Sequence, residues 1–162
     1  MYKRVIVPLD GSELAEQALP NATQLARASN APLLLVSVVG YPYLESKGLS
    51  SWALQQEALD QVVKEETDRA QQYLESVRST LAADGFEVSS EVRRGSVDRA
   101  ILADPQPGDV IVMTTHGRGG VARWFLGSVA EDVVRRSAVP VLLVRIHPKE
   151  QAATGSWSPR LD

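Results

Sequence analysis

Five short apolar runs alternate with segments of helical periodicity along this chain, and this alternation limits the folds open to it. The runs cover residues 4–9, 33–39, 86–92, 110–114 and 141–145. They are rich in β-branched residues and too short for buried helices, so each is expected to form a strand. Strands that alternate with helices are typical of α/β proteins, in which helices cover both faces of a parallel sheet. We therefore predict a five-stranded parallel sheet with about four helices.

The helical segments carry recognisable start and stop signals. The first helix is expected to begin at Ser12 and to be kinked or split at Pro20, because proline removes a backbone donor. The longest helix is predicted over about residues 57–81, with one apolar stripe, and a turn at residues 84–85 ends it. Ser96 is expected to cap a short fourth helix. The helices thus fill the intervals between the predicted strands.

Composition narrows the class of protein. With 162 residues, 44% of them hydrophobic, the chain suits one compact domain with a well-covered sheet. A net charge of -3 without a basic block argues against nucleic-acid binding, and the absence of cysteine excludes disulfides and thiolate chemistry. No run of about 18 apolar residues predicts a membrane span. We expect a soluble, cytoplasmic protein.

Two segments fall outside the alternation of strands and helices. The first extends from Gly40 to Trp52 and is rich in aromatic residues, so we expect a lid or a contact loop. The second, residues 147–162, is rich in alanine, serine, glycine and proline and is expected to be a flexible tail. Residues 1–146 are therefore expected to form the folded domain.

The segment between the fourth predicted strand and the last helix has the composition of an anion site. Glycines allow the backbone to approach a phosphate closely, and a helix N-terminus offers unpaired N–H groups with a partial positive charge. Ser128 is expected to be the N-cap of that helix. The alternative is an ordinary loop with solvated arginines. The candidate phosphate-binding residues are Gly117, Arg118, Arg123, Gly127 and Ser128.

Asp10 follows the first predicted strand, at the edge of the sheet where ligands bind in open parallel α/β proteins. Its carboxylate suits a ribose hydroxyl or a metal ion. The alternative is that Asp10 only helps Gly11 and Ser12 to turn the chain and to begin a helix. Both interpretations stay open from the residues alone.

Several kinds of enzyme site are disfavoured. His116 has no aspartate or serine at a recognisable triad or metal spacing, so a structural histidine is favoured over a catalytic or zinc-binding one. Residues 117–122 satisfy a lone G-x-G-x-x-A pattern, but they follow the fourth strand and lack the expected acidic residue downstream. The G-x-x-x-x-G-K-[ST] pattern of P-loop proteins does not occur.

Taken together, several separated motifs resemble the universal stress protein family. They are Val-Ile-Val-Pro-Leu-Asp-Gly-Ser at residues 5–12, the strand at 33–39, Gly95 before Ser96, Thr-His-Gly-Arg at 115–118, and the segments 126–131 and 140–144. They occur in the family's order over about residues 1–146. The resemblance implies a Rossmann-like, adenine nucleotide alpha hydrolase-like three-layer sandwich around the five-stranded parallel sheet.

The resemblance also implies a nucleotide site. The family's phosphate loop reads G-x2-G-x9-G-[ST], and its four positions correspond here to Thr114, Gly117, Gly127 and Ser128 with both spacings preserved. Thr114 replaces the first glycine, and a threonine does not adopt positive φ cheaply. By resemblance, Asp10 and Val38 contact ribose or adenine beside Pro8, and the glycine-rich positions hold phosphates. The full implied set is Pro8, Asp10, Val38, Met113, Thr114, Gly117, Arg118, Gly127, Ser128 and Val129.

The function implied by this resemblance is ATP binding, with Mg²⁺ or Mn²⁺, in a regulatory stress-response protein. No residue resembles a tuned general base, so little or no ATP hydrolysis is expected. The resemblance also implies a homodimer through the last strand, between Pro140 and Arg145. One alternative is a nucleotide-independent interaction module of the same fold, with residues 41–52 contacting a partner. A nucleotide-transforming enzyme is disfavoured, because residues 9–12 lack a Ser-Gly-Gly loop.

Overall fold

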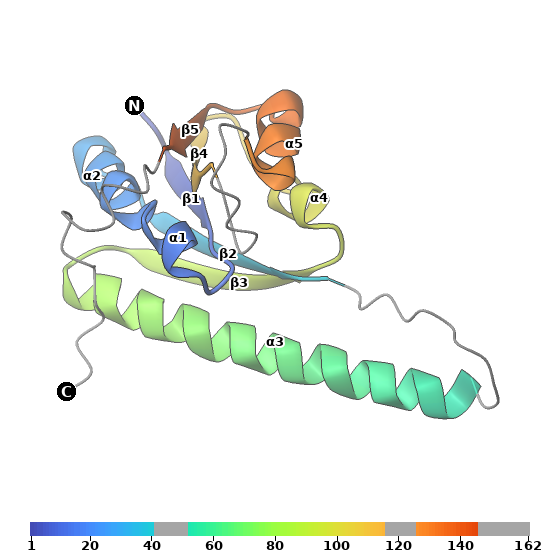
Figure 1. Ribbon diagram of the computed structural model, residues 1–162. Coiled ribbons are helices and arrows are strands. Elements are labelled where there is room, and N and C mark those ends of the chain that lie inside the picture. Colours follow the sequence, from blue (N-terminus) through green and yellow to red (C-terminus); the bar gives the residue numbers. More distant parts are fainter. Residues whose placement is uncertain (41–51, 116–125, 146–162) are drawn as a thin grey trace.

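A twisted parallel sheet forms the centre of the computed structural model, which describes residues 1–40, 52–115 and 126–145, with side chains in the second range from residue 59 onward (Figure 1). Within these residues the sheet has five strands in the order β3-β2-β1-β4-β5. The predicted five-stranded parallel sheet is confirmed. The strands are β1 (Arg4–Pro8), β2 (Leu33–Val39), β3 (Val88–Arg94), β4 (Asp109–Thr114) and β5 (Val141–Val144).

Helices cover both faces of this sheet (Figure 1). In chain order they are α1 (Glu13–Glu16), α2 (Leu19–Ser29), α3 (Trp52–Ala83), α4 (Val97–Ile101) and α5 (Ser128–Arg136). Alternate residues of the central strands point to opposite faces, because successive side chains of a strand alternate in direction. Val5, Val7, Leu33 and Leu35 pack with α1, α2 and α3. Ile6, Leu34, Val36 and Ile111 pack with α4 and α5, so the predicted three-layer sandwich is confirmed.

The first predicted helix begins and divides as expected. The Oγ atom of Ser12, the N-cap of α1, accepts a hydrogen bond from the backbone N–H of Ala15 at 3.1 Å. The helix is then interrupted between α1 and α2, and Pro20 lies in the first turn of α2. A proline is tolerated there, because a first-turn N–H has no partner within the helix. The predicted helix is therefore split as expected, but at residues 17–18, just before Pro20.

Helix α3 is longer than the predicted span of residues 57–81, and Trp52, which we placed in a loop, is its first residue. Leu74, Val77 and Leu81 are buried against the sheet, as the stripe predicts. Val62, however, is 45% exposed, so its placement in the packed stripe was wrong. Figure 1 shows that the first turns of α3 run past the end of the sheet, where a helix face has no strands to pack against.

The predicted turn at residues 84–85 ends α3. The strand that follows, β3, begins at Val88 and not at residue 86 as predicted. Gly85 has φ +86°. The N–H of Gly85 donates to the carbonyl of Ala82 at 3.0 Å, and the N–H of Phe86 donates to the carbonyl of Leu81 at 3.1 Å. This is the Schellman arrangement that satisfies the last carbonyls of a helix. Phe86 belongs to this helix end and not to the strand.

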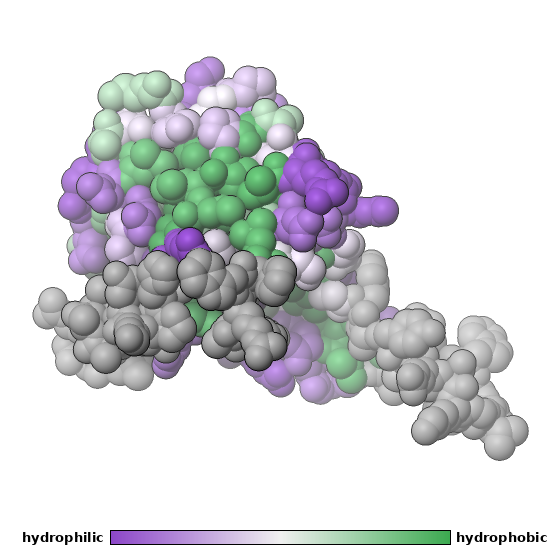
Figure 2. Space-filling view, turned by 45° about the horizontal axis from the view of Figure 1, so that its top comes forward, coloured by the Kyte–Doolittle hydropathy of each residue, from purple (hydrophilic) through white to green (hydrophobic). Residues whose placement is uncertain are grey.

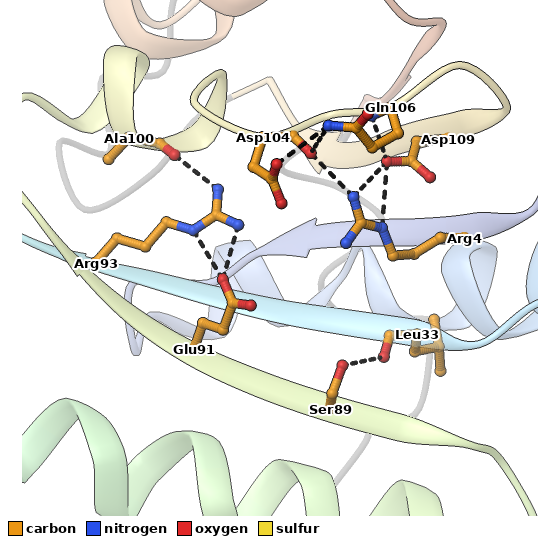
Figure 3. Close-up of polar contacts among 9 residues, drawn as sticks. All are labelled: Arg4, Leu33, Ser89, Glu91, Arg93, Ala100, Asp104, Gln106 and Asp109. Carbon is orange, nitrogen blue, oxygen red and sulfur yellow. Dashed lines mark hydrogen bonds and ion pairs between the residues drawn. The ribbon is translucent and has the colours of Figure 1, made fainter.

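A partly buried ion pair joins β1 to β4 at the amino ends of both strands (Figure 3). The Nε and Nη2 atoms of Arg4 donate to Oδ2 of Asp109 at 3.2 and 2.6 Å, and the backbone N–H of Gln106 donates to the same oxygen at 2.8 Å. The hydrogen bond to Asp109 raises the pKa of Arg4 above its ordinary value. Arg4 and Asp109 are also partners in the β1–β4 register. The pair therefore fixes the alignment of the two strands whose opposite ends form the candidate site.

Candidate functional site at the carboxyl edge

The strand order places a topological switch point between β1 and β4. From β1 the chain proceeds outward through β2 and β3, then crosses to the other side of β1 to form β4 and β5. The connections that leave the carboxyl ends of β1 and β4 therefore diverge, and ligands of open α/β sheets bind in the crevice between such connections. The predicted site residues that the structure describes come from these two strand ends, from the end of β2 and from the start of α5.

At the end of β1, Asp10 is half-buried and held in a tight turn. Its Oδ1 atom accepts a hydrogen bond from the backbone N–H of Ser12 at 3.0 Å and from Oγ of Ser12 at 2.6 Å. Gly11 has φ +78°, a conformation that favours glycine. Asp10 therefore does form the turn that was one of the two open interpretations. The turn also fixes its carboxylate at the edge where a ligand would lie.

At the end of β4, Met113 and Thr114 are both buried. Thr114 is the last residue of the strand and lies beside Val144 in the register with β5. Among the described residues, Asn30 is the non-glycine residue with positive φ. Thr114 thus has ordinary extended geometry, and the threonine in place of the first motif glycine imposes no left-handed strain. The positive-φ part of the objection raised from the sequence therefore does not apply, and the effect of the Thr114 side chain on close approach of a ligand stays a prediction.

Backbone hydrogen bonds join the end of β4 to the start of α5. The N–H of Gly127 donates to the carbonyl of Thr115 at 2.8 Å, and the N–H of Thr115 donates to the carbonyl of Val144 at 3.2 Å. These bonds hold the first turn of α5 beside the carboxyl ends of β4 and β5. Gly117 and Arg118, together with Arg123 and His116, lie outside the described residues.

The N-cap of α5 is Gly127, so the prediction of Ser128 as the N-cap was wrong by one residue. The physical reason is that the first helical hydrogen bond, from the N–H of Glu131 at 2.9 Å, ends on the carbonyl of Gly127. Ser128 is the first helical residue. Because the N–H of Gly127 is already bonded to Thr115, the helix offers an anion the N–H groups of its first turn. Those groups belong to Ser128, Val129 and Ala130, and sequence reasoning missed Ala130.

Val38 lies near the carboxyl end of β2, beside β1, and is half-buried against the cluster that α4 and α5 cover. Pro8, the last residue of β1, lies beside Val36 in the register of the two strands. The described residues thus supply an apolar wall from β2, a carboxylate after β1 and a helix start after β4. This combination suits a ligand with an apolar ring, a hydroxylated middle part and an anionic end.

Tyr73 of α3 contacts α1, the helix that follows Asp10, and was identified from the sequence only as part of an apolar stripe. Its hydroxyl donates to Oε1 of Glu16 in α1 at 3.0 Å. Burial raises the pKa of Tyr73 far above its ordinary value, and the negative charges of Glu16 and Asp10 add to the shift. Tyr73 therefore stays protonated and does not act as a base. The only sequence signal for this contact was the presence of a tyrosine, with its polar hydroxyl, within the apolar stripe of α3.

Within the described part of the chain, no three His, Cys, Asp or Glu side chains are grouped so that they could hold a metal ion. A Mg²⁺ ion commonly takes much of its coordination from substrate phosphates and water. Of the helices in the described ranges, none is both long enough and apolar enough to span a bilayer.

The comparisons with known proteins agree with this architecture. The model of the universal stress protein family matches residues 1–145. The universal stress protein MJ0531 of Methanocaldococcus jannaschii is 31% identical over 153 residues, which are 93% of this chain and 86% of that protein. An α/β protein with a five-stranded parallel sheet and helices on both faces is the class that the fold defines. The chain belongs to the universal stress protein family, which confirms the resemblance seen in the motifs.

Solved structures support the same conclusion. The structure of MJ0577, a universal stress protein of Methanocaldococcus jannaschii, has a TM-score of 0.76 at 28% identity. The match covers 91% of this chain and 98% of that one. A universal stress protein solved in complex with cAMP has a TM-score of 0.53 at 27% identity and covers 88% of this chain and 97% of its own. The fold is therefore that of the family over nearly the whole chain.

Proposed function

We propose that this protein binds ATP at the carboxyl edge between β1 and β4 and acts as a regulatory stress-response protein of the cytoplasm. The observation that carries the proposal is the first turn of α5, which the bond from Gly127 to Thr115 holds at the switch point with its N–H groups available to an anion. The cAMP complex of a related universal stress protein supports a nucleotide as the ligand.

Each part of the site has an expected role. Asp10 contacts the ribose, and Val38 contacts ribose or adenine beside Pro8. Thr114, with Met113 beside it, lines the passage from the nucleoside to the phosphates. The phosphates lie on the helix start, and Mg²⁺ or Mn²⁺ is held largely by phosphate oxygens. The proposed phosphate contacts are Gly117, Arg118, Gly127, Ser128 and Val129, with Gly127 contributing close approach rather than its N–H.

Hydrolysis of bound ATP is expected to be slow or absent. A catalytic base near neutral pH needs a pKa close to that pH and a position within hydrogen-bond distance of the attacking water. Tyr73, with its raised pKa, does not meet the first condition. The helix start of α5 binds the ground state without supplying a proton acceptor. Binding without turnover suits a sensor better than an enzyme.

The expected partner is a second copy of the chain, joined through β5. This strand is an edge of the sheet, and its residue Leu142 is 40% exposed. Figure 2 shows a broad apolar area bounded by polar flanks on the side turned forward, where β5 lies in Figure 1. Uncovered apolar edge strands invite pairing with another chain. Pairing of two β5 strands removes both the open edge and the exposed leucine.

One observation favours a second candidate function, a nucleotide-independent interaction module. Thr114 replaces the first glycine of the phosphate-loop pattern. Its side chain is buried at the end of β4 and leaves less room for a ligand there than glycine would. The proposed contact loop of that module, residues 41–51, lies outside the described residues. The two functions make opposite predictions for ATP.

The midpoint of thermal unfolding, measured with and without millimolar Mg·ATP, distinguishes ATP binding from the nucleotide-independent interaction module. A ligand that binds only the folded state, present at 100 times its Kd, raises the free energy of unfolding by about 2.7 kcal/mol. For a domain of this size that corresponds to a rise of about 5–10 °C. No rise in a well-folded wild type would refute ATP binding and leave the interaction module.

Two variants of one residue place the site. Gly127 has φ −61° and ψ 148°, a backbone geometry open to other residues, and both Asp and Asn are good N-caps. Gly127→Asp adds a negative charge at the phosphate position and is expected to abolish the ATP-dependent rise, although its midpoint without ATP does not fall. Gly127→Asn is the matched neutral control and is expected to retain part of the rise. Equal responses of the two variants would contradict the placement of the phosphates.

A further inference from the structure

We propose that the open edge of β3 and the adjoining surface of α3 form a docking site for an extended, basic peptide segment of another protein. The peptide adds to the sheet as a further strand and places a lysine or arginine side chain between β3 and α3. The site lies at the edge of the sheet opposite β5. It is independent of the proposed nucleotide function, so neither proposal stands or falls with the other.

Within the described residues, β3 has a neighbouring strand on one side, β2, and an open edge on the other. The N–H of Leu33 donates to the carbonyl of Glu87 at 2.9 Å, and the N–H of Gly95 donates to the carbonyl of Val39 at 3.1 Å. Because backbone groups of successive strand residues point to opposite sides, the odd-numbered residues of β3 bond to β2. The residues whose N–H and C=O groups therefore point to the open edge are Val88, Ser90, Val92 and Arg94.

A groove of about 450 Å³ lies between this strand and α3, the helix that runs beside β3 in Figure 1. Leu74, which is almost fully buried, and Val92, which is half-buried, supply its apolar lining. Gln71, Gln72 and Glu75 of α3 line it with exposed polar side chains. The groove thus has an apolar strip next to the open backbone, with amides and a carboxylate at its rim.

An open strand edge beside a groove lined by a helix suits an extended peptide that adds as a strand. In such complexes main-chain hydrogen bonds provide affinity, and a groove that receives alternate side chains provides selectivity. The edge of β3 has seven residues, so it can pair with a peptide of about five to seven residues. Alternate side chains of a strand share a face, so one face of the bound peptide is directed to the groove.

The charge of the groove favours a basic peptide. Its described lining residues include the carboxylates Glu75 and Glu91 and no lysine or arginine. Glu75 is paired with Arg78, but these side chains are 55% and 36% exposed, and such exposed pairs contribute little. A lysine or arginine of the peptide can lay its apolar stem against Leu74 and Val92 and reach Glu75 with its charge. An acidic side chain at the same position faces two carboxylates.

Amide hydrogen exchange of the full chain, followed by NMR, tests the edge with a capped peptide of sequence Thr-Lys-Thr-Lys-Thr-Lys-Thr. In the free protein we expect fast exchange at Ser90 and Val92 and slow exchange at Ser89 and Glu91, which face β2. Millimolar peptide is expected to slow the exchange of Ser90 and Val92. Ser90→Pro removes one outward donor, a change that edge strands tolerate, and is expected to weaken binding about 2-fold to 10-fold.

A charge exchange tests the groove. The wild type is expected to prefer the lysine peptide over the same peptide with glutamates. Glu75→Lys is expected to weaken the lysine peptide about 2-fold to 5-fold and to reverse this preference. Glu66→Lys is the matched control, because Glu66 pairs with Arg69 as Glu75 pairs with Arg78 but does not line the groove. This control is expected to keep the wild-type preference.

Unchanged exchange at Ser90 and Val92 in millimolar lysine peptide would overturn the proposal. So would a preference that Glu75→Lys leaves as it is, or that Glu66→Lys reverses equally. Slow exchange of both amides in the free protein would also overturn it, because another part of the chain or a second copy then holds the edge, and sedimentation velocity tells these two apart. If Ser90→Pro does not fold, Glu75→Lys, at an exposed position, still tests the proposal.

Discussion

Removing Arg4 is expected to destabilise the protein more than removing its partner Asp109, although both substitutions break the same ion pair. In Arg4→Ala the Asp109 carboxylate, which is 4% exposed in the wild type, keeps the hydrogen bond from the backbone N–H of Gln106. In Asp109→Ala the guanidinium is 26% exposed to water and still donates to the carbonyl of Asp104 at 3.0 Å. The buried Asp109 carboxylate left without Arg4 therefore lowers the free energy of unfolding more than the Arg4 guanidinium left without Asp109.

The magnitudes follow from these environments. Breaking a buried ion pair by removing one partner costs about 3–5 kcal/mol when the remaining charge is uncompensated. We expect Arg4→Ala to fall in that range and Asp109→Ala to cost about 2–3 kcal/mol, because water and Asp104 compensate the arginine. Domain stabilities are about 5–15 kcal/mol, so the first loss is a large fraction of the total.

Urea unfolding at neutral pH and 25 °C measures both values, provided that the slope against urea is unchanged. Arg135→Ala is the matched control, since its pair with Glu131 is exposed on both sides and should contribute less than about 1 kcal/mol. A loss below about 1 kcal/mol for Arg4→Ala, or a larger loss for Asp109→Ala, would refute the argument from the buried carboxylate. Replacing both residues together, Arg4→Met with Asp109→Leu, should cost less than Arg4→Ala alone.

Two further predictions concern α3 and the sheet edge. Because the folded state raises the pKa of Tyr73 above the unfolded value of about 10, stability is fully present below that pH and falls as pH rises further, by up to about 1.4 kcal/mol per pH unit. Urea midpoints against pH should show a shallower alkaline fall for Tyr73→Phe, and identical curves would contradict the burial argument. Leu142→Lys places a charge on the apolar edge strand β5 and should convert the proposed dimer to monomers, as measured by sedimentation velocity. Val134→Lys, at an exposed site on α5, is the control and should leave the dimer intact. A wild type that sediments as a monomer would refute the β5 dimer.

The sequence predicted the elements better than their arrangement. Alternating apolar runs were enough for the parallel sheet and its two covered faces, because period-2 and period-3.6 patterns reflect burial directly. The strand order was not predicted from the pattern. The polar residues of β3 are typical of an edge strand, but β1, β2 and β4 are all apolar runs, and nothing in their composition indicates which of them lies between the other two. The exposed Val62 shows a related limit: periodicity identifies the face of a helix but not where the sheet beneath it ends.

At the candidate site, the motifs indicated which residues lie at the sheet edge but not the backbone geometry there. Asp10 and Gly127 lie at the sheet edge where the motifs implied them. The N-cap was misplaced because the strong preference of serine for that position outweighed a glycine, whereas the carbonyl that takes the first helical bond decides it. The concern over Thr114 assumed a positive φ that its place in β4 does not require.

The strand order also has a consequence for synthesis on the ribosome. The first strand to emerge, β1, is the middle strand of the finished sheet, and one of its neighbours, β4, begins only at Asp109. At about 5–20 residues per second, β1 and β2 wait roughly 4–14 seconds for that neighbour. During that interval the β1 edge opposite β2, and with it Val5 and Ile6, has no strand beside it. We expect nascent chains shorter than about 110 residues to depend on chaperones, and the domain to become self-sufficient only after about three quarters of it has been made.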